Sequence, residues 1–189
     1  MARNKKEWRK LSSLEIFKTK FFKFRSDELE LPNKVIQPRY YVMEFSDWVN
    51  VVALTAKNEL ILIKQYRHAV EEICLEIPGG SINPGSGEAP EAAALRELTE
   101  ETGYVPREIK LLGYHEPNPA LMSNKLWTYL ALDCEKLKEQ ELDPFEDIEV
   151  ITCPPEDVFK LVKSGEIRHS LVIAAIHLAE DYLRTSPKT

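Results

Sequence analysis

The chain has 189 residues, of which 43% are hydrophobic and 30% are charged, and its formal net charge is −6 at pH 7. This length and apolar content are those of a folded domain with its own core, and they exclude a disordered low-complexity chain. The acidic balance makes nucleic acid a poor partner, because phosphate backbones are bound by basic surfaces. No apolar run approaches the roughly 18 residues of a membrane-spanning helix, so we expect no membrane partner.

The N-terminus and the cysteines bear on the location of the protein. The basic residues 3–10 are followed by further lysines rather than by an unbroken apolar stretch, so no export signal is predicted and we expect a cytoplasmic protein. Residues 3–10 themselves are interpreted as a solvated tail. The three cysteines, Cys74, Cys134 and Cys153, form no Cys-x-x-Cys pair, which argues against a disulfide framework and a zinc ribbon.

The first part of the chain is rich in β-strand signals. Residues 14–24 and 34–45 alternate roughly between apolar and polar side chains, which predicts two half-exposed strands. Pro32 and Asn33 lie between them and indicate a turn, so we expect antiparallel hairpins. A layer of this size cannot bury alone all the apolar side chains that it carries, which are Phe17, Phe21, Phe22, Tyr40, Tyr41 and Val42.

The rest of the chain mixes strands and helices. Buried strands joined by short turns are expected at residues 49–55, 59–67 and 72–78. Pro90 suits the first turn of a helix, and strong helix formers follow it up to Gly103, a typical residue just beyond a helix end. Further strands are expected at 109–116, 125–133 and 149–153, and further helices at 154–163 and 171–183. The predicted fold class is α+β.

The helix after Pro90 concentrates carboxylates on one side. Glu97, Glu100 and Glu101 fall within an arc of about 100° on a helical wheel, and the like charges at positions 97 and 101 repel each other. Hard oxygen ligands in such a stripe are what Mg²⁺ or Mn²⁺ prefers. A solvated acidic face explains the helix alone equally well. The glycine-rich loop before it favours a site, since glycines allow a diphosphate or a metal to approach the backbone closely.

This loop and helix together resemble the Nudix box, which is Gly, five residues, Glu, seven residues, then Arg-Glu-apolar-any-Glu-Glu-any-Gly-apolar. The chain matches every specified position from the first glutamate onward, at Glu88, Arg96, Glu97, Leu98, Glu100, Glu101, Gly103 and Tyr104. Seven residues rather than five separate Gly80 from Glu88. Either the loop is two residues longer than usual, or the box glycine is a different one.

The resemblance implies an α/β/α sandwich around a mixed sheet, with a Nudix hydrolase domain at residues 46–189 and an N-terminal β-strand region at residues 1–45. It also implies a site in which a water attacks one phosphorus of a nucleoside diphosphate linked to another group, assisted by Mg²⁺ or Mn²⁺. The metal would be held by Glu97, Glu101 and Glu100 and by the carbonyl of Gly79. Arg96 would orient the glutamates, and Glu88 would support the helix.

Two segments, residues 64–80 and 115–131, are similar to those of the ADP-ribose and nucleoside-diphosphate-sugar pyrophosphatases within this family. That similarity makes Arg67 a diphosphate contact, for which a guanidinium is well suited. It also points to Glu76 and Pro119 as substrate-binding residues. Without the family context, Arg67 would be interpreted as a surface arginine and Glu76 as a solvated carboxylate at a sheet edge.

The same similarity bears on assembly and base recognition. The resembling enzymes are homodimers in which the N-terminal region packs across the partner and helps to line the nucleotide pocket, so we expect a homodimer. Aromatic side chains for stacking on the base are available at Tyr40, Tyr41 and Trp48.

The catalytic base is expected on a loop after the central strands. In the resembling group a glutamate of that loop activates the water or completes the metal shell. The acidic residues there are Glu139, Glu141, Asp143 and Glu146, and Glu146 is the best placed, just before the next strand. Such loops are ordinarily only solvated. His115 is the other candidate base, although a lone histidine beside a strand is more often structural.

The leading hypothesis is therefore a Mg²⁺-dependent pyrophosphatase that converts nucleoside-diphosphate sugars into a nucleoside monophosphate and a sugar phosphate. ADP-ribose is the first candidate substrate, and GDP-mannose is the second. One alternative is hydrolysis of another linked diphosphate, such as a dinucleoside polyphosphate, a coenzyme A derivative or capped RNA. Another is a Nudix-like module that binds a nucleotide without cleaving it. Such a sensor could lose its metal-binding glutamates, whereas this chain keeps a like-charge cluster that is unfavourable without a cation.

Overall fold

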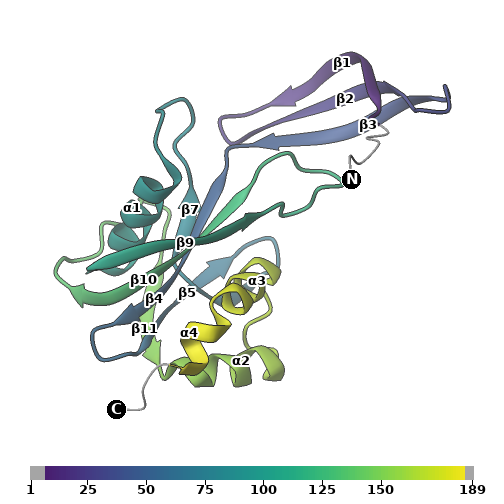
Figure 1. Cartoon of the computed structure of the whole chain (residues 1–189). Coiled ribbons are helices and arrows are strands. Elements are labelled where there is room, and N and C mark those ends of the chain that lie inside the picture. Colours follow the sequence, from purple (N-terminus) through teal and green to yellow (C-terminus); the bar gives the residue numbers. More distant parts are fainter. Residues whose placement is uncertain (1–6, 186–189) are drawn as a thin grey trace. The chain divides into compact units, whose positions relative to one another are not determined.

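A computed structural model describes residues 7–185 of the chain. These residues form two compact units (Figure 1). The first contains residues 7–46 together with 116–125, and the second contains residues 47–115 and 126–185. Residues 116–125 thus group with the first unit, although the sequence places them within the expected Nudix domain. Residues 3–6 of the expected basic tail lie outside the described part of the chain.

The first unit contains an antiparallel sheet in the order β1-β2-β3. Its strands are β1 (Arg9–Lys18), β2 (Phe22–Glu30) and β3 (Ile36–Phe45). The antiparallel character is as expected, but the single strand predicted at residues 14–24 is wrong. The Thr19 hydroxyl accepts hydrogen bonds from the backbone N–H groups of Phe21 and Phe22, and this turn separates β1 from β2.

The aromatic side chains of this sheet divide between its interior and its surface. Phe22 stacks on Phe45 with ring centroids 5.2 Å apart, and Tyr41 stacks on Phe24. Val42 is buried, so its expected exposure was wrong, and Phe22 and Tyr40 are half-buried. Apolar side chains of this sheet and its turns that remain exposed include Leu14, Phe17, Phe21 and Tyr41.

The second unit is built on a mixed sheet in the order β11-β5-β4-β10-β8, to which β6, β7 and β9 pair at β5, β4 and β10. Strands β4 and β10 are parallel, and the other pairs are antiparallel. The strands are β4 (Trp48–Thr55), β5 (Leu60–Arg67), β6 (Glu72–Glu76), β7 (Gly79–Ser81), β8 (Tyr104–Val105), β9 (Glu108–His115), β10 (Leu126–Lys136) and β11 (Ile148–Cys153).

Helices cover both faces of this sheet (Figure 1). They are α1 (Pro90–Thr102), the 3-10 turn η1 (Pro155–Asp157), α2 (Val158–Ser164), α3 (Ser170–Leu178) and α4 (Glu180–Thr185). Successive residues of β4 point to opposite faces, so Val51 packs in one core cluster with Leu98 of α1, and Val52 packs in another with Val172 of α3. The predicted α/β/α sandwich is therefore present.

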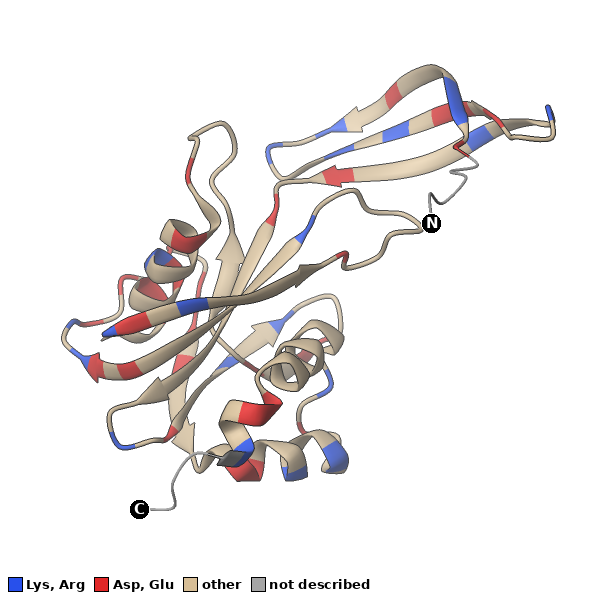
Figure 2. Cartoon of the chain, viewed as in Figure 1, with Lys and Arg blue, Asp and Glu red and all other residues tan. Residues whose placement is uncertain are grey.

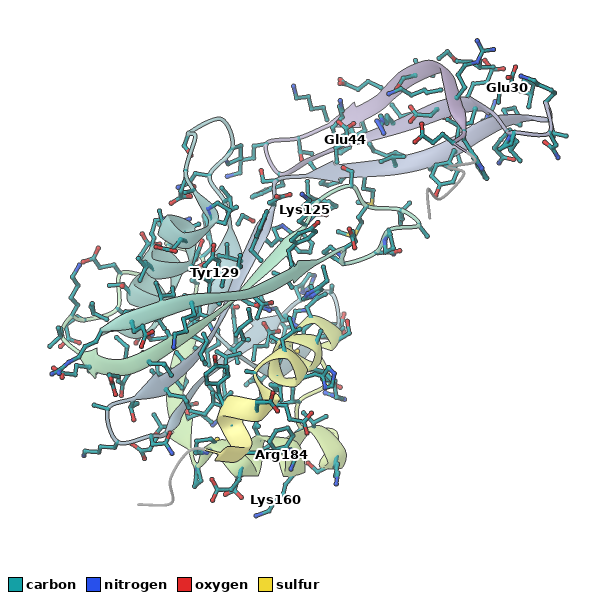
Figure 3. The ribbon with its side chains drawn as sticks, in the orientation of Figure 1. Glu30, Glu44, Lys125, Tyr129, Lys160 and Arg184 are labelled. Carbon is teal, nitrogen blue, oxygen red and sulfur yellow. The ribbon has the colours of Figure 1, made fainter. Side chains whose placement is uncertain are left out.

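The C-terminal helices close the second face. The guanidinium of Arg184, labelled in Figure 3, lies 4.0 Å from the ring centroid of Phe159, which fastens α4 to α2. The helix predicted at 171–183 is interrupted, since α3 ends at Leu178 and α4 begins at Glu180. Within residues 7–185 no helix has the length and apolar content to cross a bilayer.

Two glycines that end helices allow a matched test of the fold. Gly103 after α1 and Gly165 after α2 both have positive φ angles, of 75° and 81°. A Cβ at Gly103 would lie 2.2 Å from the carbonyl oxygen of Lys138, whereas one at Gly165 would meet nothing within 4 Å. We expect Gly165→Ala to lower the free energy of unfolding by about 1–2 kcal/mol, from backbone strain alone.

For Gly103→Ala we expect a loss at least about 2 kcal/mol larger, because the backbone of residues 137–138 must also move. Urea denaturation of the two variants measures both values. Equal losses would show that the close approach of Lys138 contributes nothing.

Candidate active site

Two glutamates of helix α1 lie against the two glycines of β7. The backbone N–H of Gly79 donates a hydrogen bond of 2.8 Å to Oε2 of Glu101. A Cβ at Gly80 would lie 2.4 Å from the carboxyl carbon of Glu97, and one at Gly79 would lie 2.4 Å from the carbonyl oxygen of Val49. A side chain at Gly79 is thus sterically excluded by the backbone of β4, whereas one at Gly80 would displace the carboxylate of Glu97. Gly80 is the glycine beside Glu97 even though the loop to Glu88 is two residues longer than the box pattern.

Arg96 joins the box residues into one network, and acidic and basic segments adjoin along α1 (Figure 2). Its guanidinium donates to both oxygens of Glu88, at 2.8 and 3.2 Å, and to the carbonyl oxygen of Ser81. It also donates to Glu97 at 2.8 Å and to Glu100 at 3.0 Å. These partners, Glu88 first among them, raise the pKa of Arg96 and keep it charged. The guanidinium of Arg96 therefore contacts three carboxylates, those of Glu88, Glu97 and Glu100.

Burial makes the negative charges of Glu97 and Glu101 unfavourable. Glu101 is 3% exposed, and this burial raises its pKa well above the usual range despite the hydrogen bond from Gly79. Burial also raises the pKa of Glu97, although Arg96 opposes the effect. The charge of Glu146 raises both pKa values further. Three carboxylates from two segments of the chain therefore repel one another across this site.

The donor set fits a hard divalent cation, which would offset that repulsion. Within residues 7–185, however, no three acidic, histidine or cysteine side chains are arranged as a complete metal site. Arg96 contacts one oxygen each of Glu97 and Glu100, and Gly79 contacts one oxygen of Glu101. Binding a cation would require those side chains to share or exchange these partners. Gly79 contacts Glu101 through its N–H, and the role of its carbonyl as a metal ligand stays a prediction.

Arg67, at the end of β5, is held by a buried carboxylate. Its Nε and Nη2 donate to Oε1 and Oε2 of Glu76, at 3.1 and 2.7 Å, in a two-point pair. Nδ1 of His169, just before α3, lies 3.4 Å from the same Oε1. Glu76 is 4% exposed, so the interpretation as a solvated sheet-edge carboxylate is wrong. The charge of Glu101 acts on the pKa of Arg67, so this pair adjoins the cluster on α1.

The aromatic and proline candidates lie in different units. Trp48 begins β4, is half-buried and pairs across the sheet with Ser81 of β7. Pro119 is exposed on the segment 116–125 of the first unit. In that unit the hydroxyl of Tyr40 donates to the carbonyl oxygen of Ala120 at 2.8 Å. The role of Pro119 in substrate binding stays a prediction.

The acidic loop at residues 137–147 carries the expected base. Oε2 of Glu146 accepts a hydrogen bond of 3.0 Å from the backbone N–H of Asp143, which fixes the side chain within a turn. The charge of Glu146 raises the pKa of both Glu97 and Glu101, so this loop carboxylate lies near the cluster. His115, the other candidate, is half-buried in β9.

Sequence reasoning missed two side chains around these groups. His169 was missed because no motif contains it, and only the packing of α3 brings it to Glu76. Gln140 was missed because its partners are the backbone carbonyls of Glu101 and Ile148, which a sequence pattern does not reveal.

The Glu76 pair predicts a pH dependence of stability. Burial alone would raise the pKa of Glu76, but hydrogen bonds from His169 and Arg67 outweigh it and lower the pKa from 4.5 to about 2. Stability gained from the ionised carboxylate is therefore complete above pH 4.5 and is lost as the pH falls toward 2. We expect Glu76→Gln to lower the free energy of unfolding at pH 7 by about 1–3 kcal/mol.

The difference between wild type and Glu76→Gln should shrink between pH 4.5 and 2, as followed by urea denaturation across that range. Glu72→Gln, an exposed carboxylate of the same strand, is the control and should show a small difference. A difference that stays constant with pH would contradict the assignment.

The chain is similar to known proteins over most of its length. Residues 46–176 match the model of the NUDIX domain family. The chain is 33% identical over 171 residues to the ADP-ribose pyrophosphatase of Bacillus subtilis, covering 90% of this chain and 91% of that protein. It is 29% identical over 171 residues to the methanol dehydrogenase activator of Bacillus methanolicus, with the same coverage of each chain.

A solved structure supports the same conclusion for the fold. The crystal structure of an ADP compounds hydrolase superposes with a TM-score of 0.82 at 24% identity, and the match covers 97% of each chain. The expected Nudix fold and the resemblance to the family are confirmed. The chain belongs to the NUDIX domain family and is a Nudix hydrolase.

Proposed function

We propose that this protein is a Mg²⁺-dependent pyrophosphatase that hydrolyses nucleoside-diphosphate sugars, with ADP-ribose as the first candidate substrate and GDP-mannose as the second, to a nucleoside monophosphate and a sugar phosphate. The observation that carries the proposal is the buried carboxylate cluster of α1 against the glycines of β7, with Arg67 beside it. The name of the Bacillus subtilis relative, ADP-ribose pyrophosphatase, supports the choice of substrate.

Arg67 would bind the diphosphate. Its Nε and Nη2 are held by Glu76, which fixes the plane of the guanidinium before substrate arrives. A group oriented in advance loses less conformational freedom on binding. The side chain is 42% exposed, so its outer edge is accessible to phosphate oxygens.

The metal would be held by Glu97, Glu101 and Glu100. When bound, Mg²⁺ or Mn²⁺ would acidify an attacking water and neutralise charge on the phosphate oxygens. Arg96 would keep the carboxylates in place through its contacts with Glu97 and Glu100. Glu146 would act as the general base, accepting the proton of that water at its carboxylate oxygen.

The first unit would supply base recognition and assembly. Tyr40 and Tyr41 of this unit, together with Trp48 of the second unit, are the proposed stacking side chains, and Pro119 of the first unit is a proposed contact. The exposed Phe17 and Phe21 support a homodimer formed through this sheet. The free state of Cys74, Cys134 and Cys153 suits a cytoplasmic location, where thiols stay reduced.

The metal ligands can be tested by charge-neutral substitutions. We expect Glu97→Gln and Glu101→Gln each to lower kcat at least about 100-fold, because losing a ligand removes several kcal/mol of charge stabilisation. In the absence of metal both variants should be as stable as wild type or slightly more so, since one of two repelling carboxylates is neutral. Release of nucleoside monophosphate from ADP-ribose with Mg²⁺ and with Mn²⁺ is the assay.

The matched control is Glu91→Gln, an exposed glutamate in the first turn of the same helix, which should leave kcat unchanged. Turnover like wild type in both cluster variants would end the metal assignment. If the wild type cleaves no nucleoside-diphosphate compound with either metal, the sensor alternative is favoured.

If Arg67 binds the diphosphate, its loss should raise KM equally for substrates that carry different sugars. Because its partner is the shared diphosphate, Arg67→Ala should raise KM for ADP-ribose and for GDP-mannose by similar factors, about ten-fold each, or about 1.4 kcal/mol. A rise in KM for one substrate alone would assign Arg67 to the base or the sugar instead.

The proposed dimer predicts a mass near 44 kDa, twice the 21.8 kDa of the chain. Light scattering at micromolar concentration measures this mass directly. We expect Phe21→Asp to shift it toward the monomer, because Phe21 is a large apolar side chain that is 69% exposed in the turn between β1 and β2. A wild type that is already a stable monomer would refute the dimer.

A further inference from the structure

The acidic loop at residues 137–147 is built onto the C-terminal end of α1. The backbone N–H groups of Leu137 and Lys138 donate to the carbonyl oxygen of Gly103, each at 3.1 Å, and the N–H of Glu141 donates to the carbonyl oxygen of Glu100 at 2.9 Å. A helix end leaves carbonyls without partners inside the helix. Here the loop supplies partners, so its first half is fixed to the helix that carries the carboxylate cluster.

Gln140 completes this attachment with a single side chain. Its Nε2 donates to the carbonyl oxygen of Glu101 at 2.6 Å and to that of Ile148 at 3.1 Å. Glu101 lies at the end of α1, and Ile148 is the first residue of β11. One amide group therefore connects the metal-binding end of the helix to the strand at which the acidic loop ends.

These contacts enclose a short segment, residues 141–147, whose two ends are joined by Gln140. Glu146 lies within it, two residues before Ile148, and its carboxylate is held by the N–H of Asp143. The N–H of Glu146 donates in turn to the carbonyl oxygen of Asp143 at 2.9 Å. With both ends of so short a segment fixed, few positions remain for the Glu146 side chain relative to Glu101.

We propose that Gln140 is a positioning residue for catalysis, which ties Glu101 of the metal helix to Ile148 of β11 and so holds Glu146 at the reaction site. The proposal rests on the proposed function, in which Glu146 is the base. It assigns no contact between Gln140 and the substrate. A Gln140 that only capped the helix would act on α1 and not through Glu146.

The test compares Gln140→Leu, which removes the amide, with Gln140→Glu, which keeps the shape of the side chain but removes the donor. For both variants we expect kcat for ADP-ribose to fall about ten-fold, a fraction of what a general base contributes, with KM within about two-fold of wild type. Gln37→Leu is the control, since the Nε2 of Gln37 donates to a carbonyl in the first unit and its loss should leave kcat unchanged.

A double-mutant cycle separates the two roles of Gln140. In a Glu146→Gln background, Gln140→Leu should lower kcat by less than about two-fold, because the residue through which it acts is already gone. A full ten-fold loss in that background, or a rise in KM with kcat unchanged, would overturn the proposal.

Amide hydrogen exchange gives a readout that needs no substrate or metal. The amide of Glu141 donates to the carbonyl oxygen of Glu100 in α1, and those of Asp143 and Glu146 donate within the segment. All three should exchange at least about ten-fold faster in Gln140→Leu, while the amides of α1 keep their protection. Unchanged exchange in the segment, or equal loosening of α1, would overturn the positioning role. Failure of the wild type to cleave ADP-ribose would instead refute the proposed function, and the exchange result would still stand by itself.

Discussion

Burial of two glutamate side chains of α1 against the glycine backbone of β7 is the constraint on which the rest of the site depends. Glu101 accepts the N–H of Gly79, and Glu97 occupies the space that a side chain at Gly80 would fill. A side chain at Gly80 would displace the Glu97 carboxylate, so a glycine there lets this carboxylate lie directly against β7. The apolar face of α1 is in contact with β4, so the packing that buries the carboxylates also buries Leu98 in the core.

Burying these carboxylates close together is electrostatically unfavourable, and neighbouring residues offset only part of the cost. Burial raises the pKa of Glu101 and of Glu97, and Glu146 adds a third negative charge nearby. Arg96 offsets part of the repulsion by contacting Glu88, Glu97 and Glu100 together. A surface helix would avoid such a cluster, whereas a helix that receives a divalent cation is stabilised by it on binding. The electrostatics and the family membership are therefore in agreement.

The remaining parts of the site come from segments far apart in the sequence. Arg67 and Glu76 end neighbouring strands, His169 precedes α3, and Gln140 lies on the acidic loop. Each is held by hydrogen bonds to side chains or carbonyls of another element. The carboxylate cluster is thus surrounded by two networks, one around Glu76 and one around Gln140. The network around Glu76 orients the guanidinium of Arg67, which we assign to the diphosphate. The network around Gln140 fixes the loop that carries Glu146.

The sequence by itself determined the α1 helix, its ending at Gly103 and the stripe of glutamates, because helix propensity, capping and periodicity act over a few neighbouring residues. It also indicated the α+β class, whereas the mixed sheet was implied only by the resemblance to the Nudix family. Only the tertiary structure decided that residues 14–24 are split by the Thr19 turn, that Glu76 is buried, and that Gln140 reaches two distant carbonyls. These features depend on contacts between residues that are far apart in the chain or on a single side-chain hydrogen bond, and no local pattern of residue types encodes them.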